Sequence, residues 1–199
     1  MKKQEKEAKK ITKEFVEKLK GLKEVEGIVV YGSFVRGFFD KYSDLDILCF
    51  CKRIPDEKKR IEKVKEIGGI NYNPGGWYLH DHFMCKGIEP TVEYEDITDT
   101  RRMLKQVRKS GFSGGESSDK TWAHLINARI LYDKNGYIKK YKKEAESFLR
   151  ELPKHFREIF GYVEHCLWNK NSLLVSIKRG NLIFPNQVIN KTLDKLIRA

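Results

Sequence analysis

Two carboxylates, Asp44 and Asp46, stand two positions apart in the segment SDLDIL at residues 43–48. In an extended strand, side chains at this spacing leave the backbone on the same face, with Cα atoms about 6–7 Å apart. Two carboxylates on one face repel each other unless a cation lies between them. Oxygen ligands favour Mg²⁺, which binds through a couple of carboxylates together with substrate phosphates. The pair therefore predicts a magnesium site.

A glycine and a serine, Gly32 and Ser33, follow the apolar run at residues 27–31. Glycine permits a close approach of the backbone, and serine offers a hydroxyl and an amide to an anion. A helical turn that begins at Ser33 would add its amino-terminal dipole, and Arg36 would add a positive charge. We therefore expect a phosphate-binding turn beside the metal site.

The two features together form the pattern YGSxxRGxxxxxSDLD, which runs from Tyr31 to Asp46. This pattern resembles the nucleotidyltransferase superfamily, which includes DNA polymerase beta, the aminoglycoside and lincosamide nucleotidyltransferases, and small prokaryotic antitoxin nucleotidyltransferases. The resemblance covers residues 27–96. It implies that Asp44 and Asp46 are catalytic metal ligands, and that the nucleotide is bound by Gly32, Ser33, Arg36 and Ser43.

Members of the superfamily use a third carboxylate on a later strand. Glu93 lies between Val92 and Tyr94 in the expected apolar–acid–apolar form, so the resemblance favours it as the third catalytic and metal-binding residue. Glu95 would lie on the same face and is the alternative. Asp81 is a weaker candidate, in a segment where His80 and His82 alternate along a polar strand face.

The resemblance implies transfer of a nucleoside monophosphate from a nucleoside triphosphate to a hydroxyl acceptor, with two Mg²⁺ ions and release of pyrophosphate. A small hydroxylated molecule is our first choice of acceptor, and a protein side chain or RNA follows. A non-enzymatic, antitoxin-like nucleotide-binding module is the alternative. Because the family often builds its site at a dimer interface, the resemblance is also compatible with a homodimer.

The periodicity of the apolar residues predicts the elements that position this site. A three- and four-residue spacing predicts a helix over residues 3–22 and another over 55–67. Short β-branched runs predict strands at 27–31 and 45–51, and a hairpin of strands at 77–85 and 91–95. We expect a turn at residues 71–76 and a helix from residue 98 or 99 to about 109.

The segment GFSGGESS, between Ser110 and Asp119, is typical of a linker and suggests a domain boundary. We expect a nucleotidyltransferase domain at residues 1–112, with a small mixed β-sheet and flanking helices, and an α-helical bundle at residues 113–199. The fold class is therefore α+β. Helices are predicted at 122–131, 137–152, 154–168, 172–178 and 186–198.

The 199-residue chain has a formal net charge of +12, which comes entirely from residues 100–199. A basic half is compatible with nucleic acid as a second partner, although a solvated lysine-rich surface is the plainer explanation. There is no apolar run long enough for a membrane span and no signal peptide pattern. The expected location is therefore the cytoplasm, without a membrane partner.

Overall fold

The computed structural model describes residues 2–37, 39–75, 80–110 and 124–151, together with residues 177, 178 and 180. The chain divides into two compact units, Met1–Glu151 and Leu152–Ala199. The helices expected beyond residue 152 lie outside the described residues, except that residues 177 and 178 are helical. The account below therefore concerns the first unit.

A six-stranded sheet forms the centre of the described part of this unit, in the order β3-β4-β5-β2-β1-β6. β2 and β5 are parallel, whereas every other neighbouring pair is antiparallel. The mixed sheet with helices on it confirms the predicted α+β class. The bounds are β1 Val25–Val30, β2 Leu45–Cys51, β3 Ile70–Gly75, β4 His80–Met84, β5 Pro90–Asp96 and β6 Arg129–Asp133.

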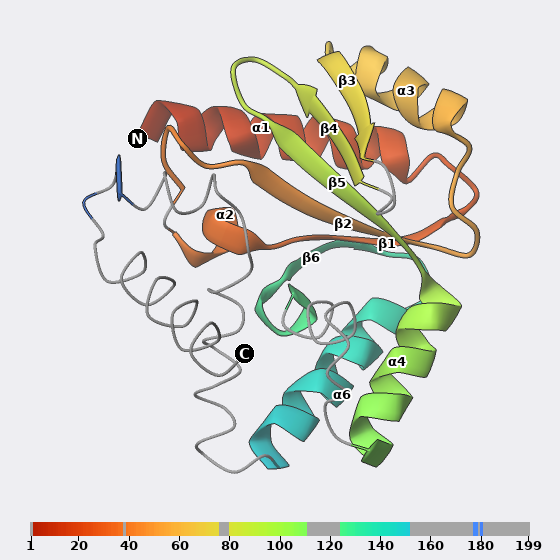
Figure 1. The fold of residues 1–199 in the computed structure, drawn as a ribbon. Helices are drawn as coiled ribbons and strands as arrows, with labels where there is room; N and C mark the ends of the chain where they lie inside the picture. The colour runs from red at the N-terminus through yellow and green to blue at the C-terminus, as the bar shows by residue number, and fades with distance from the viewer. Residues whose placement is uncertain are drawn as a thin grey trace, which may run out of the picture. The chain divides into compact units, whose positions relative to one another are not determined.

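Helices lie on both faces of the sheet (Figure 1). α1 (Lys2–Leu19) and α3 (Glu57–Glu66) cover one face, and α4 (Ile97–Ser110) and α6 (Tyr137–Glu151) cover the other. The short helix α2 (Gly32–Arg36) follows β1 directly. α1 buries Ile11, Phe15 and Leu19 completely, as the predicted amphipathic spacing requires.

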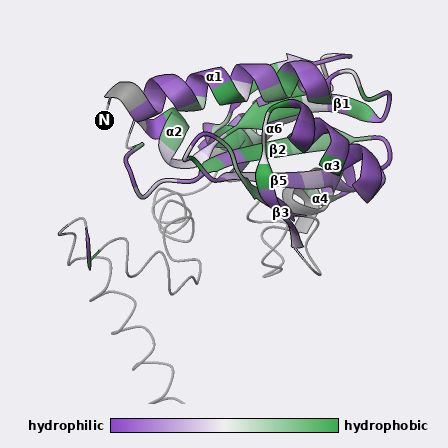
Figure 2. Ribbon diagram, turned by 90° about the horizontal axis from the view of Figure 1, so that it is seen from above, coloured by the Kyte–Doolittle hydropathy of each residue, from purple (hydrophilic) through white to green (hydrophobic). Residues whose placement is uncertain are grey.

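The main hydrophobic core lies between the sheet and the helices α1 and α3. The rings of Phe15 in α1 and Phe83 in β4 meet edge to face, with centroids 5.4 Å apart. Figure 2 shows hydrophilic residues on the outer side of α1 and hydrophobic residues in the strands beneath it. On the opposite face, Ile138 of α6 occupies the space where a side chain at Gly27 would stand.

Two expectations about local structure were wrong. Residues 71–76 were expected to form a turn, yet residues 70–75 form β3, which pairs with β4 at the edge of the sheet. An edge strand tolerates Pro74 because its outer side needs no ladder hydrogen bonds. The segment at 122–131 was expected to be helical, yet helical residues end at 127 and β6 begins at Arg129.

β6 pairs with β1, about a hundred residues earlier in the chain, so local periodicity gave no signal for it. Asp133 then caps α6, because its carboxylate accepts hydrogen bonds from the backbone N–H groups of Ile138 and Lys139, at 3.3 and 2.9 Å. β6 and α6 follow the predicted division at residue 112, yet they belong to the same compact unit as the residues before it.

Within the described ranges, no helix combines the length and apolar character that a membrane crossing needs.

Candidate active site

The predicted phosphate-binding turn lies against one of the two predicted metal ligands. Gly32, the first residue of α2, has a φ of +69°, and a Cβ built on it would collide with Oδ2 of Asp46. The backbone N–H of Tyr31 donates a hydrogen bond of 3.1 Å to the backbone carbonyl of Asp46. The turn after β1 and the start of β2 are thus fixed to each other, and glycine is the residue that permits the contact.

Ser33 follows in the same turn. Its hydroxyl oxygen is buried and has no hydrogen-bond partner among the described residues. A buried hydroxyl without a partner loses free energy relative to one that is bonded. An anion placed against the turn would supply the missing acceptor, so Ser33 fits a phosphate oxygen.

The other two predicted nucleotide-binding residues flank this turn. Arg36 lies in the last turn of α2. Ser43 lies before β2, where its Oγ accepts a 3.0 Å hydrogen bond from the backbone N–H of Asp40 and lies 3.2 Å from Oδ1 of the same residue. Asp40 Oδ1 also accepts a hydrogen bond from the backbone N–H of Tyr42. Ser43 therefore orders the loop that leads to Asp44.

The strand register places the predicted acids on one face of the sheet. Asp44 is exposed just before β2, and Asp46 is half-buried within it. Asp46 is paired with Thr91 of β5. Glu93 is two residues beyond Thr91 in the same strand, so its side chain lies on the same face of the sheet as that of Asp46. Strand spacing and rise put the Cα atom of Glu93 about 8 Å from that of Asp46, whereas Glu95 lies about 14 Å away. The register thus brings Glu93 nearer to Asp46 than Glu95.

Glu95 is also engaged elsewhere, because it accepts a 3.0 Å hydrogen bond from the hydroxyl of Thr100 in α4. Asp81 lies on the opposite face of the sheet, buried beneath α3. It forms an ion pair with Arg60 Nη1 at 2.6 Å and accepts a hydrogen bond from the hydroxyl of Tyr72, also at 2.6 Å. Burial raises the pKa of Asp81 in spite of these partners. Asp81 is therefore a structural group on the far face.

Three aromatic side chains from separate elements surround Glu93. His80 Nε2 lies 3.4 Å from Oε1 of Glu93, and His124 Nδ1 lies 3.8 Å from Oε2. Tyr31 stacks on His124 with ring centroids 4.0 Å apart. Burial, and next the charge of Glu93, raise the pKa of Tyr31 well above its ordinary value, and Asp46 and Asp44 add to the effect. The negative charges of all three acids thus act on Tyr31.

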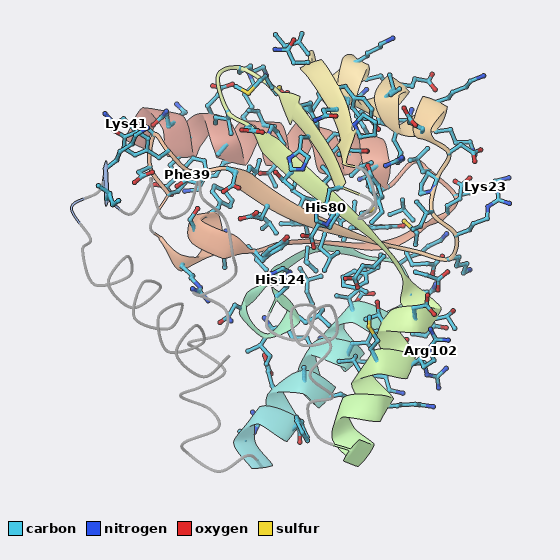
Figure 3. All side chains as sticks on the ribbon, in the orientation of Figure 1. Lys23, Phe39, Lys41, His80, Arg102 and His124 are labelled. Atoms are coloured by element: carbon cyan, nitrogen blue, oxygen red, sulfur yellow. The ribbon has the colours of Figure 1, made fainter. Side chains whose placement is uncertain are left out.

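Sequence reasoning gave no role to Tyr31 as a side chain and did not identify His124. Figure 3 labels both histidines, His80 in β4 and His124 in the helical residues 124–127. His124 follows the Gly- and Ser-rich segment and belongs to no motif, so no local signal marks it. His80 was expected only on a polar strand face. Among the described residues, no three His, Cys, Asp or Glu side chains form a metal-binding cluster by themselves.

Residues 8–98 match the protein family described as a nucleotidyltransferase domain. This confirms the predicted resemblance and the predicted nucleotidyltransferase class. A solved toxin–antitoxin structure with AMP-PNP is 13% identical and covers 76% of this chain and 96% of its own, with a TM-score of 0.37. A mutant of the toxin–antitoxin MntA–HpeT is 12% identical and covers 78% and 97%, with a TM-score of 0.34. No curated protein is significantly similar in sequence.

Proposed function

Because residues 8–98 match the nucleotidyltransferase domain family, we propose that the protein transfers a nucleoside monophosphate from a nucleoside triphosphate to a hydroxyl group, with Mg²⁺ at Asp44 and Asp46. The observation that carries the proposal is the contact of Gly32 with Asp46. It brings a backbone turn that can bind phosphate directly beside a carboxylate that can bind a cation. Triphosphate and cation would therefore meet at one place.

The donor set fits Mg²⁺ bound to a nucleotide. Asp44 and Asp46 offer carboxylate oxygens, and Mg²⁺ usually takes its remaining ligands from phosphates and water. A site completed by substrate requires no separate cluster of three protein ligands. Glu93 would add one carboxylate to a second cation position, and substrate oxygens and water would complete it. When bound, the ions would neutralise charge on the triphosphate and lower the pKa of the acceptor hydroxyl.

The groups of the chain itself have separate tasks in this proposal. The Ser33 hydroxyl donates to a phosphate oxygen, and Arg36 adds a positive charge beside the triphosphate. Glu93 accepts the proton of the acceptor hydroxyl. The acceptor oxygen then attacks the α-phosphorus, the bond to the bridging oxygen of the β-phosphate breaks, and pyrophosphate leaves. Positioning and charge stabilisation supply most of the acceleration.

The surroundings of Glu93 favour an acceptor that is narrow at its reactive end. The Glu93 side chain is only 9% exposed, between His80 and His124. An acceptor hydroxyl has to reach down to this carboxylate. A small hydroxylated molecule is the acceptor that we propose.

The replacement Asp46→Asn tests the proposal. It keeps the shape of the side chain and removes its charge, so nucleotidyl transfer should fall at least about 100-fold. Asp99→Asn is the matched control, since Asp99 is exposed and pairs with Arg102 at 3.0 Å. Each triphosphate, labelled at the α-phosphate, is incubated with Mg²⁺ and with aminoglycosides, lincosamides, tRNA or total cell protein. Transfer by the Asp46→Asn variant at the wild-type rate would contradict the assignment.

The same panel identifies the acceptor. Label in an aminoglycoside or a lincosamide would support the small-molecule proposal, whereas label in tRNA or in protein would replace it. A wild-type protein that is stabilised by Mg²⁺ and a triphosphate, yet transfers no label, would support the nucleotide-binding module instead.

A further inference from the structure

The third acid of the site, Glu93, contacts a residue that lies outside the nucleotidyltransferase match. The match ends at residue 98, whereas His124 lies beyond the Gly- and Ser-rich segment. We propose that His124 and Tyr31 are positioning residues, which fix the Glu93 carboxylate in the orientation that metal binding and transfer require. This inference rests on the proposed function and adds residues to its site.

Both oxygens of Glu93 have a partner at a defined place. Oε1 lies 3.4 Å from His80 Nε2 and Oε2 lies 3.8 Å from His124 Nδ1. At these distances, which are longer than an ordinary hydrogen bond, each imidazole approaches one oxygen and so favours one rotation of the carboxylate. The carboxylate needs this restraint, because two further acids lie on the same face of the sheet and repel it.

His124 is itself held in place from two sides. The next residue, Leu125, is completely buried and anchors the helical residues 124–127. The imidazole stacks on Tyr31 at an interplanar angle of 23°. Tyr31 is 6% exposed, and its backbone is bonded to that of Asp46. A continuous set of contacts thus runs from Asp46 through Tyr31 and His124 to Glu93.

His124 and Tyr31 would thus orient the proposed metal ligand Glu93 without touching the metal ion themselves. Groups that orient a ligand without touching the metal typically change metal affinity or activity by about 10–100-fold when they are removed. His82 supplies a natural comparison on the same strand face. Its Nδ1 lies 3.2 Å from the hydroxyl of Thr91, and its ring meets that of His80 edge to face, with centroids 6.2 Å apart. His82→Phe keeps an aromatic ring for this contact and removes both nitrogens.

The test uses variants that keep the ring stack and remove single polar groups. His124→Phe retains an aromatic ring and loses both nitrogens, and Tyr31→Phe loses only the hydroxyl. Mn²⁺ binding without nucleotide is measured by electron paramagnetic resonance, and kcat and KM are measured for transfer. His124→Phe should weaken Mn²⁺ binding and lower kcat by about 10–100-fold, with little change in KM for the triphosphate. Tyr31→Phe keeps the ring stack and the backbone bond to Asp46, so its losses should be clearly smaller than those of His124→Phe. His82→Phe should match the wild type.

A double-variant comparison separates positioning from general structural damage. In a Glu93→Gln background, His124→Phe should cause no further loss, because its effect acts through Glu93. His124→Gln, which returns an N–H donor, should recover part of the lost Mn²⁺ affinity. Circular dichroism and the melting temperature establish that each variant is folded.

The outcomes distinguish this inference from the proposed function. Wild-type Mn²⁺ affinity and kcat in His124→Phe, or an equal loss in the Glu93→Gln background, would overturn the positioning role alone. If the wild type transfers no nucleotide while the Mn²⁺ measurements show the expected coupling, the proposed function fails and the positioning of Glu93 stands. Absence of Mn²⁺ binding to the wild type would overturn both.

Discussion

Replacement of Gly32 by alanine should lower transfer by about 100-fold and leave the protein folded. At a φ of +69°, any side chain is strained, and the new Cβ would collide with Oδ2 of Asp46. The collision falls on the carboxylate and not on the backbone, so the Asp46 side chain has to move away. The substitution therefore displaces a proposed metal ligand without removing it.

The backbone part of this cost can be estimated separately. An alanine in the left-handed region costs roughly 1–2 kcal/mol. In a unit of this size, each kcal/mol lowers the melting temperature by about 2–4 °C, so Gly32→Ala should melt about 2–8 °C below the wild type. A displacement of about 1 Å at a reacting group can lower the rate by about 100-fold. The loss of activity should thus be much larger than the loss of stability suggests.

Gly68→Ala is the matched control for the backbone cost. Gly68 has a φ of +75°, and a Cβ built there meets nothing within 4 Å. Both variants are compared by differential scanning calorimetry and by transfer of labelled nucleoside monophosphate. Gly68→Ala should lose similar stability and keep its activity. Unchanged transfer by Gly32→Ala, or an equal loss of transfer in Gly68→Ala, would refute the reasoning about the contact with Asp46.

Three further predictions concern stability and pH. Arg60→Met leaves the buried carboxylate of Asp81 without its ion pair at 2.6 Å, so the free energy of unfolding measured in urea should fall by about 3–5 kcal/mol. Adding Asp81→Asn should restore much of this stability. A double variant as unstable as Arg60→Met would count against the ion pair. Asp133→Ala removes the cap of α6 and should cost about 1 kcal/mol by the same measurement, whereas an unchanged unfolding midpoint would exclude the cap. Burial acts to raise the pKa of Glu26, but contacts with Lys52, Asn135 and Lys134 outweigh it and lower the pKa below the ordinary 4.5. The folded pKa of Glu26 is thus below the unfolded one, so its stabilising contribution is complete above about pH 4.5 and is lost as the pH falls through the folded pKa. Glu26→Gln should therefore reduce stability at pH 7 and weaken the pH dependence between about pH 5 and 3, and identical pH profiles for both proteins would contradict this assignment.

Most residues of the candidate site could be proposed from the sequence because they lie close together along the chain. Gly32, Ser33, Asp44 and Asp46 lie within one strand–turn–strand segment, and their spacing alone places the turn beside the acids. The choice between Glu93 and Glu95 was different. Alternation puts both on one face, and only the pairing of Asp46 with Thr91 shows that Glu93 lies nearer.

The fold was predictable where a segment carries its own periodicity. The amphipathic α1 and the apolar β2 follow directly from the order of their residues, and β2 has the predicted bounds of 45–51. β3 was missed because an edge strand with mostly exposed side chains shows no apolar alternation. β6 was missed because pairing with β1, and not local preference, makes residues 129–133 a strand.

The sequence by itself led to the proposed class of chemistry: a turn expected to bind phosphate, a pair of acids expected to bind a cation, and the strands that carry them. Only the tertiary structure decided what surrounds the third acid. His80, His124 and Tyr31 reach Glu93 from three separate places in the chain. Such contacts depend on how strands pair and helices pack over long sequence distances. The free energy that favours these contacts comes from strand pairing and helix packing across the assembled sheet, so it cannot be read from a short segment of the sequence.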